Sequence, residues 1–258
     1  MTHYRSFAAR LRGLFAGDVR SIERQLAQGE ISKNTYYDLL SEKIMRRVLR
    51  TDSVCVDVGC HAGSILRTMM SIAPQGEFFA FEPLPDLFAG LKASFDLPNV
   101  HLYEVALSDK EGSSSYNHVL TDPALSGLIR RGYFRDNEKD ESIEVATRTL
   151  DGVLAAHGSP KVRFIKVDVE GGELLVFRGA IRTLRESRPW IAFEHGLGAS
   201  DYYGYGAKEA HEILAGECGL EISLLAGWLK GKPALTRSEF IEDYENGRNF
   251  FYLAHPPR

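Results

Sequence analysis

The chain has 258 residues, of which 44% are hydrophobic, and its 31 basic and 35 acidic side chains give a net charge of −4. This composition is that of a globular protein; it excludes a disordered or fibrous chain and argues against nucleic acid as a partner. The three cysteines form no CxxC pair, which excludes a disulfide scaffold and fits a reducing compartment. The sequence contains no apolar run of the roughly 20 residues that span a membrane, and Arg12 interrupts any secretory core, so we expect a cytoplasmic protein.

Residues 1–50 predict a helical preface to the rest of the fold. Apolar residues at helical spacing, from Phe7 to Phe15, predict a helix over residues 5–30, and a second helix is expected over Tyr36–Arg50. Arginines occupy the other side of the first helix. It therefore packs either on the domain or on a sister chain, or it makes peripheral contact with a membrane surface.

Residues 51–258 predict an α/β body, because short apolar runs alternate with helical segments in a way that is typical of parallel sheets covered on both faces. Strands are expected at Ser53–Val58, Glu77–Phe81, Val100–Leu107, Val162–Val167 and Trp190–Phe193, and helices at Ser64–Ala73, Pro85–Phe95, Glu173–Leu184 and Lys208–Cys218. Two further strands, Glu221–Ala226 and Asn249–Ala254, have no predicted helix of comparable length between them. They predict a closing antiparallel pair at one edge.

Residues 109–161 form a long excursion between the third and fourth parallel strands. Ser113–Val119 and Ser142–Thr147 predict a hairpin, and the segment between them is polar. Loops of this length usually bind something, so we expect the excursion to cover the substrate. Arg130, Arg131 and Tyr133 are its candidate binding residues, since basic and aromatic side chains suit a sugar with an anionic group. The alternative is a solvated loop whose charges are balanced by nearby acids.

The most informative stretch is the first strand and the turn after it, Val54-Cys-Val-Asp-Val-Gly-Cys-His-Ala-Gly-Ser64. In an open parallel sheet, ligands bind outside the carboxyl ends of the strands, near the switch point. We expect Gly59 to permit a sharp turn there and Gly63 to let a ligand approach the backbone. The G-x-x-x-G spacing differs from the G-x-G-x-x-G of dinucleotide sites, and no Lys-Ser or Lys-Thr follows as in a phosphate-binding loop.

Two acidic residues accompany these glycines. Glu82 follows the second strand, about 20 residues after the glycines, where a carboxylate accepts both hydroxyls of a ribose. Asp57, near the end of the first strand, is a candidate partner for a ligand ammonium group, directly or through the loop. A nucleoside joined to an amino acid is the composition of S-adenosyl-L-methionine. The two acids and two glycines together predict a site for this cofactor.

A second glycine turn carries the candidate catalytic groups. Asp168 and Glu170 lie in Lys166-Val-Asp-Val-Glu-Gly-Gly-Glu173, at the carboxyl end of the sheet, where carboxylates are costly without a ligand. The fifth strand delivers Glu194 and His195 to the same edge. Because histidine titrates near neutral pH, we expect His195 to be the general base. Asp168 or Glu170 would orient it or the acceptor, Asp168 would also border the cofactor, and Glu194 would contact the acceptor.

A divalent metal is a less favoured alternative at this edge. Asp168, Glu170, Glu194 and His195 supply oxygen and nitrogen ligands that suit Mg²⁺ or Mn²⁺, and such an ion lowers the pKa of an acceptor hydroxyl. Ligands spread over two strands have no diagnostic spacing. We therefore do not expect a metal, and Asp168, Glu194 and His195 are its ligands if one binds.

The chain resembles the FkbM family of S-adenosylmethionine-dependent methyltransferases. The resemblance rests on VDVGCHAG at 56–63, FEP at 81–83, VALSDKEG at 105–112 and IKVDVEGGE at 165–173, and it spans about residues 35–255. In the first motif, Cys60 and His61 stand where the family often has Ala and Asn. This difference bears on a side-chain role at position 61 and not on the glycine turn.

The resemblance implies a Rossmann-like class I methyltransferase fold, with a mostly parallel seven-stranded sheet and an antiparallel edge strand. It implies an O-methyltransferase acting on a sugar, a glycolipid or a secondary metabolite, with Val105 and Ala106 bordering the adenine ring. Two alternatives stay open on the residues alone. A nucleotide-dependent oxidoreductase predicts the G-x-G-x-x-G that this sequence lacks, and a non-catalytic binding module predicts eroded cofactor positions.

Overall fold

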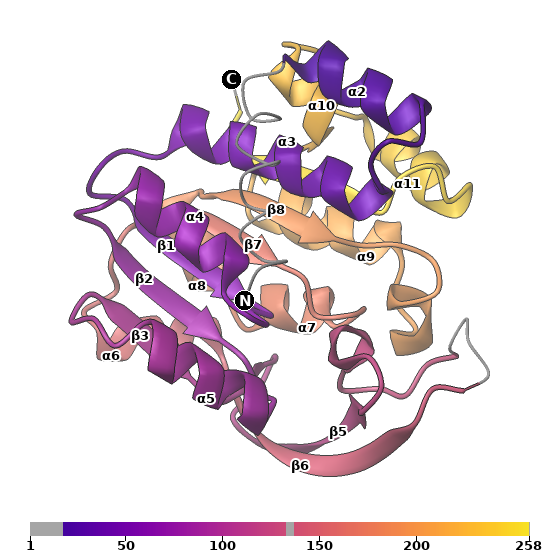
Figure 1. Cartoon of the computed structure of the whole chain (residues 1–258). Coiled ribbons are helices and arrows are strands. Elements are labelled where there is room, and N and C mark those ends of the chain that lie inside the picture. The colour runs from indigo at the N-terminus through magenta and orange to yellow at the C-terminus, as the bar shows by residue number, and fades with distance from the viewer. Residues whose placement is uncertain (1–17, 133–136, 258) are drawn as a thin grey trace.

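The computed structural model describes residues 18–132 and 137–257 and is built around one seven-stranded sheet (Figure 1). The strands are β1 (Val54–Val58), β2 (Glu77–Phe81), β3 (Val100–Tyr103), β7 (Val162–Val167), β8 (Trp190–Glu194), β9 (Glu221–Leu224) and β10 (Phe251–His255). They lie in the order β3-β2-β1-β7-β8-β10-β9, and only β10 runs antiparallel to its neighbours. The predicted mostly parallel α/β sheet is confirmed, and its antiparallel strand lies next to the outermost strand, β9.

Helices cover both faces of the sheet, because successive strand residues point to opposite sides. One face packs against α2 (Val19–Ala27), α3 (Lys33–Val48), α4 (Ser64–Ile72), α5 (Pro85–Ser94) and α10 (Leu225–Leu229). The other packs against α6 (Leu150–Ala156), α7 (Glu173–Arg178), α8 (Ile181–Ser187), α9 (Ala207–His211), the π-helical η3 (Glu212–Glu217) and α11 (Arg237–Glu245). In β8, for example, Ala192 lies in the first core and Phe193 in the second.

The excursion at residues 109–161 forms a second, three-stranded sheet. β5 (Gly112–Val119) and β6 (Asp140–Arg148) make the predicted antiparallel hairpin, and the short β4 (Ala106–Leu107) pairs with β6. The strand predicted over Val100–Leu107 is therefore two strands, because its last two residues leave the main sheet for the second one. The 3₁₀ turns η1 (Pro123–Leu125) and η2 (Ser200–Tyr203) follow β5 and β8.

Two helix predictions were wrong. The single helix expected over Glu173–Leu184 is split into α7 and α8, since Gly179 and Ala180 leave the helical conformation. The segment between β9 and β10, expected to lack a comparable helix, contains the nine-residue α11. This helix begins with a capping box between Thr236 and Glu239 and buries Phe240 in the core.

The helical preface is packed into the body. Asp18 and Ser32 cap α2 and α3 by accepting hydrogen bonds from backbone N–H groups of the first turn. Ile22 of α2 is fully buried in the same core as Phe164 of β7. Residues 1–17, which carry the apolar pattern of the first predicted helix, lie outside the described residues. Within the described ranges, no helix has the length and apolar character needed to cross a membrane.

Gly179 joins the main helical layer to the second sheet. A Cβ at this position would lie 2.1 Å from the carbonyl oxygen of Ser108, directly after β4. We predict that Gly179→Ala lowers the free energy of unfolding by about 1–3 kcal/mol, because the backbone must shift. Gly90→Ala on α5 is the matched control, since no atom would lie within 4 Å of its Cβ. It should be neutral or stabilising by up to about 1 kcal/mol. Denaturant unfolding measures both, and equal stabilities would contradict the prediction.

Candidate functional site

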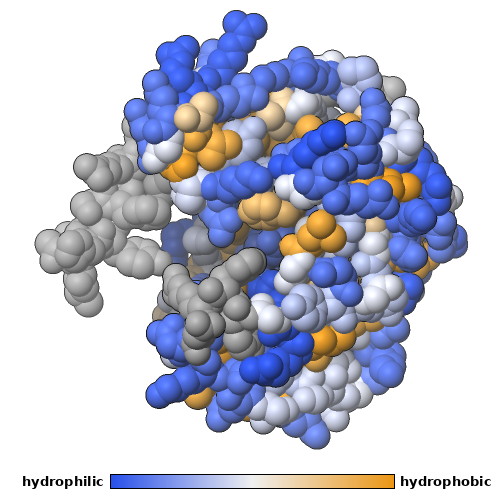
Figure 2. All heavy atoms as spheres, turned by 90° about the vertical axis from the view of Figure 1, so that its right-hand side faces the viewer, coloured by the Kyte–Doolittle hydropathy of each residue, from blue (hydrophilic) through white to orange (hydrophobic). Residues whose placement is uncertain are grey.

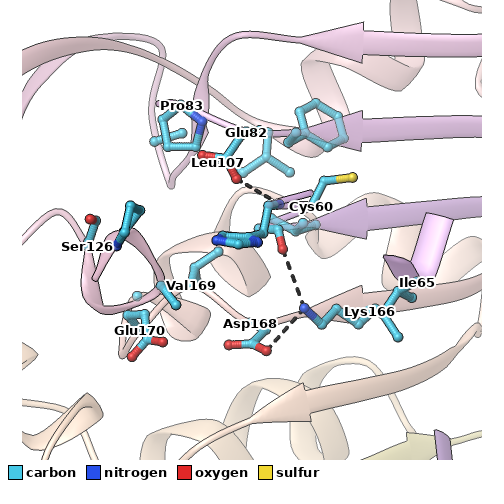
Figure 3. Close-up of a pocket in the computed structure, with 18 of the residues that line it drawn as sticks. Cys60, Ile65, Glu82, Pro83, Leu107, Ser126, Lys166, Asp168, Val169 and Glu170 are labelled. Atoms are coloured by element: carbon cyan, nitrogen blue, oxygen red, sulfur yellow. Dashed lines mark hydrogen bonds and ion pairs between the residues drawn. The ribbon is translucent and has the colours of Figure 1, made fainter. Parts of the chain in front are cut away.

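A cavity that is partly open to solvent lies at the carboxyl ends of β1, β2 and β7 (Figure 3). The strand order reverses between β1 and β7, which is where open α/β sheets bind ligands. Side chains from helices, the hairpin and the turn after β7 complete the lining, among them Asp38, Ile65, Tyr116, Ser126 and Glu170. The cavity therefore joins the cofactor edge predicted from the sequence to the excursion.

The turn after β1 requires glycine at position 59. Gly59 has a φ of +75°, and a Cβ on it would lie 1.9 Å from the carbonyl oxygen of Asp168. The backbone N–H groups of Gly59 and Cys60 donate to the carbonyl of Phe81 at 3.1 and 3.0 Å. The turn is thus held against the ends of both β2 and β7, at one side of the cavity.

Gly63 has a different role from the one predicted. It begins α4 with a φ of +76°, and a Cβ there would meet the Phe95 ring at 2.4 Å and Leu91 at 2.9 Å. It is not among the residues that line the cavity. The close approach seen at Gly63 is therefore that of α5 and the residue after it.

Glu82 reaches the cavity directly after β2. Its two oxygens accept hydrogen bonds from the backbone N–H groups of His61, at 2.8 Å, and Leu84, at 3.0 Å, and the residue is only 4% exposed. Burial raises the pKa of Glu82, while these two hydrogen bonds oppose the shift. Because a carboxylate accepts about four hydrogen bonds, the group is held in place with acceptor capacity left for ligand hydroxyls.

Asp57 lies behind the glycine turn and does not line the cavity. It is fully buried; burial raises its pKa, and the Lys166 ammonium and the Cys60 thiol oppose that shift. A ligand would reach Asp57 only through the loop, the second of the two routes expected. Val105 and Ala106 do line the cavity, on the segment that leads into β4.

Lys166 was not among the residues predicted for the site. Its ammonium lies 3.1 Å from a carboxylate oxygen of Asp168 and 3.4 Å from the carbonyl oxygen of Gly59 (Figure 3). Burial alone would lower the pKa of Lys166, but Asp168 and Asp57 raise it above its ordinary value. Alternation along β7 places residues 166 and 168 on one face, and this was the signal in the sequence that could have identified the lysine.

Glu194, the last residue of β8, faces Asp168. Burial and the carboxylates of Asp168 and Glu170 raise the pKa of Glu194 well above its ordinary value. Burial alone would also raise the pKa of Asp168, but Lys166 and a hydrogen bond from Glu194 hold it below the usual range. The two shifts run in opposite directions, so Glu194 is the carboxyl that holds a proton more readily and Asp168 the one that ionises more readily.

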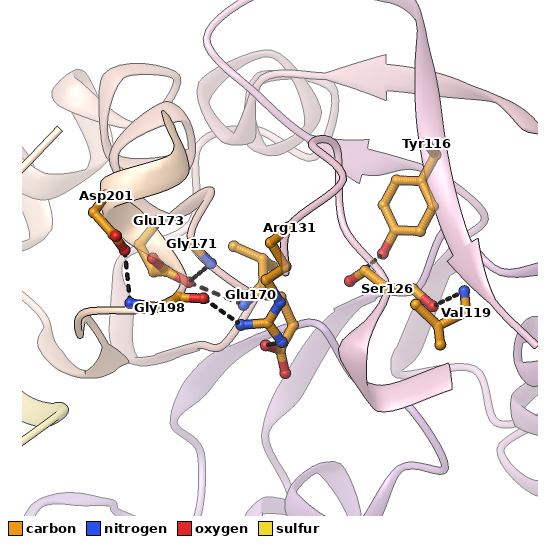
Figure 4. Close-up of polar contacts among 10 residues, drawn as sticks. Tyr116, Val119, Ser126, Arg131, Glu170, Gly171, Glu173, Gly198 and Asp201 are labelled. Carbon is orange, nitrogen blue, oxygen red and sulfur yellow. Dashed lines mark hydrogen bonds and ion pairs between the residues drawn. The ribbon is translucent and has the colours of Figure 1, made fainter. Parts of the chain in front are cut away.

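The turn after β7 brings Glu170 to Arg131, which follows η1 in the chain (Figure 4). Glu170 has a φ of +56°, and its carboxylate pairs with the Arg131 guanidinium, which also donates to the carbonyl of Gly198 at 3.4 Å. Burial raises the pKa of Glu170 to about 8; Arg131 opposes this shift and Asp168 adds to it. The Arg131 pair therefore holds the excursion against the acidic end of the cavity. On the same turn, Glu173 accepts from the N–H groups of Gly171 at 3.0 Å and Val169 at 3.2 Å, both of which precede α7.

His195 does not reach the cavity, so its prediction as the general base is corrected. Consecutive residues of a strand point to opposite faces, and Glu194 and His195 cannot both face the site. The His195 ring is fully buried, with its centroid 4.9 Å from that of Tyr244 and 6.4 Å from that of Phe240. Burial lowers its pKa to about 4, so it is a neutral core residue.

The set of candidate metal ligands also changes, because His195 no longer belongs to it. Asp168, Glu170 and Glu194 each place one oxygen within 4.8 Å of the others, whereas His195 lies on the far face. Such oxygens suit a divalent cation. Lys166 and Arg131 already pair with two of these carboxylates, so side-chain cations supply positive charge at the acidic end.

The two arginines predicted to bind the acceptor have different surroundings. Arg131 contacts the site through Glu170, whereas Arg130 pairs with Asp140 and has a side chain that is 65% exposed, as in the solvated-loop alternative. Tyr133 lies outside the described residues. Figure 2 views the molecule from the right-hand side of Figure 1 and shows a mainly hydrophilic surface with small scattered hydrophobic groups.

Comparison with known proteins agrees with the resemblance noted in the sequence. The model of the FkbM methyltransferase domain matches residues 57–219. The 2-O-methyltransferase NoeI of Sinorhizobium fredii is 31% identical over 176 residues, which cover 64% of this chain and 72% of that protein. The hexuronic acid methyltransferase AglP of Haloferax volcanii is 29% identical over 151 residues, which cover 57% and 60%.

Among solved structures, an FkbM methyltransferase from Methylobacillus flagellatus has 16% sequence identity and a TM-score of 0.49, covering 85% of this chain and 53% of that one. The domain match extends over more than half of the 258 residues. This chain belongs to the FkbM methyltransferase family.

Proposed function

We propose that this methyltransferase transfers the methyl group of S-adenosyl-L-methionine to a hydroxyl of a sugar, a glycolipid or a secondary metabolite. The observation that carries the proposal is the cavity at the switch point, with Glu82 fixed on one side and Asp168 and Glu170 on the other. The names of two relatives, a 2-O-methyltransferase and a hexuronic acid methyltransferase, support a sugar hydroxyl as the acceptor. Neither an oxidoreductase nor a binding module is favoured by these observations.

The lining of the cavity suits each part of the cofactor. Glu82 offers a fixed carboxylate to the ribose hydroxyls, and Val105 and Ala106 border the adenine ring. The turn at Gly59 is assigned to the methionine part, where the nearby Lys166 offers an ammonium to its carboxylate. When bound, the cofactor supplies an electrophilic methyl group on a sulfonium sulfur.

The acceptor is assigned to the acidic end of the cavity, under the hairpin loop. Transfer would form a bond from the acceptor oxygen to the methyl carbon and break the bond from that carbon to sulfur, with S-adenosylhomocysteine as the leaving group. The proton of the acceptor hydroxyl would pass to a base of the protein. Asp168 is a weak base, because Lys166 and Glu194 hold its pKa low. Glu170, with its pKa raised to about 8, matches the task better. We therefore assign Glu170 as the base and Asp168 as a residue that positions the acceptor.

Arg131 is assigned to an anionic group of the acceptor. Its side chain is only 11% exposed and pairs with Glu170, so a carboxylate or phosphate on the acceptor would compete for the same guanidinium. That competition would release Glu170 from its ion pair as the acceptor binds. A sugar acid is the acceptor that this arrangement fits best.

The proposal predicts methyl transfer to oxygen. With S-adenosyl-L-methionine labelled in its methyl group and a panel of neutral sugars, sugar acids, glycolipids and polyketides, the label should appear on a hydroxyl of at least one acceptor class. Mass spectrometry of the products locates it. A label found on nitrogen, sulfur or carbon would contradict the proposed reaction, and reactions without acceptor give the background.

The assignment of Glu170 predicts a pH dependence. A base must be ionised to accept a proton and the pKa of Glu170 is raised to about 8 before the acceptor binds, so kcat/KM for the acceptor should increase with pH through about 8. Glu170→Gln should lower kcat/KM by about 10²–10⁴-fold and remove this rise. Initial rates at saturating cofactor and low acceptor concentration, measured across the pH range, provide the comparison.

His195→Gln is the matched control for Glu170. It removes a titratable side chain next in sequence to Glu194 but on the opposite face of the sheet. It should lower thermal stability, because the ring is buried, and keep the rise of kcat/KM near pH 8. If the rise survives in Glu170→Gln and disappears in His195→Gln, the base has been assigned to the wrong residue.

A further inference from the structure

A second cluster of ligating side chains lies away from the cavity. Glu77 is the first residue of β2, His101 lies in the edge strand β3, and His157 directly follows α6. Each places one ligand atom within 4.8 Å of the other two. Glu82, at the cavity, is five residues further along the chain from Glu77, so at about 3.3 Å per residue the two positions are roughly 16 Å apart.

Strand alternation brings the cluster together. Glu77 and Phe79 of β2, and His101 and Tyr103 of β3, point to the face that α6 covers, where His157 also lies. The Phe79 ring is fully buried and stacks on His101, with centroids 4.8 Å apart, and the two imidazole rings are 4.4 Å apart. Three segments that are distant in sequence thus meet at one edge of the sheet, where Figure 1 shows α6 beside β3.

Hydrogen bonds already orient both imidazoles. The Nε2 atom of His101 lies 2.9 Å from a carboxylate oxygen of Glu77, and the Nε2 atom of His157 lies 2.6 Å from the hydroxyl of Tyr103. A metal-bound histidine usually makes a hydrogen bond with its other ring nitrogen, and Tyr103 is such a partner for His157. The side chains of His101 and Glu77 are 25% and 37% exposed, so an ion from solution can reach them.

We propose that Glu77, His101 and His157 bind one Zn²⁺ ion, with water as the fourth ligand. Two imidazoles and one carboxylate are a ligand set that zinc takes, at about 2.0–2.2 Å from each donor atom. Tetrahedral geometry at that length separates the donor atoms by roughly 3.3 Å, so the cluster contracts by up to about 1.5 Å on binding. The ion would attach the segment after α6 to the edge strands, a structural role that does not depend on the proposed function.

Calorimetric titration of the untagged, metal-free chain with Zn²⁺ tests the site. We expect one ion per chain with micromolar or tighter affinity, and at least tenfold weaker binding in His101→Ala and in His157→Ala. His118→Ala is the matched control. His118 also faces a carboxylate, Glu141, at 3.6 Å, but belongs to neither ligand cluster found among the described residues.

Thermal unfolding supplies a second measurement. Unfolding curves recorded with a chelator present check that each variant is folded without metal. Zn²⁺ at about 100 times its Kd should raise the Tm of the wild type and of His118→Ala by about 5–10 °C, and leave the double variant His101→Ala/His157→Ala unchanged. Glu194→Gln, which alters the acidic end of the cavity, should bind Zn²⁺ as the wild type does. Failure of the wild type to bind Zn²⁺, binding that persists in the double variant, or binding lost in Glu194→Gln would overturn the proposal.

Discussion

The absence of a side chain at Gly59 is the constraint on which the site depends. Its Cα faces the carbonyl of Asp168 so closely that a Cβ would lie 1.9 Å from that oxygen, and the contact sets the end of β1 against the end of β7. The Lys166 ammonium then joins the same two strands through Asp168 and the Gly59 carbonyl. On the other side, the loop residue His61 donates its backbone N–H to Glu82. One turn thus positions both the residues proposed to bind the cofactor and those proposed to bind the acceptor.

Much of this arrangement could be predicted from the sequence, because hydrophobic periodicity and strand alternation are local properties. They predicted the strands, the hairpin and the cavity edge at which Glu82 and Asp168 lie. Alternation was also sufficient to reject His195, since it directly follows Glu194, the last residue of β8, in extended backbone, and to find Lys166 two residues before Asp168. The ordinary pKa of histidine, near neutral, favours His195 as the base, but strand alternation places it on the face away from the cavity.

Other features depend on tertiary contacts that no local pattern reveals. Gly63 serves the packing of Phe95, which comes from the end of another helix. Arg131, and not its neighbour Arg130, reaches the site because Glu170 adopts a left-handed backbone conformation that presents its carboxylate to the excursion. The pKa of about 8 at Glu170 likewise arises first from burial by the surrounding chain, and the carboxylates of Asp168 and Glu173 add to it. The position of Arg131 and the pKa of Glu170, both proposed to act on the acceptor, therefore depend on contacts between distant parts of the chain.

We infer that the turn at Gly59 and the carboxylate of Glu82 form a site for S-adenosyl-L-methionine. Calorimetry with this cofactor, S-adenosylhomocysteine and NAD is the direct test. We expect one site for each sulfur ligand, no binding of NAD, and an affinity about 10–100-fold lower in Glu82→Gln, since a hydrogen bond to a charged group is worth about 1.5–3 kcal/mol. The exposed Glu104, replaced by Gln, should leave the affinity unchanged. Binding of NAD but of neither sulfur ligand would show that these residues do not form a site for S-adenosyl-L-methionine.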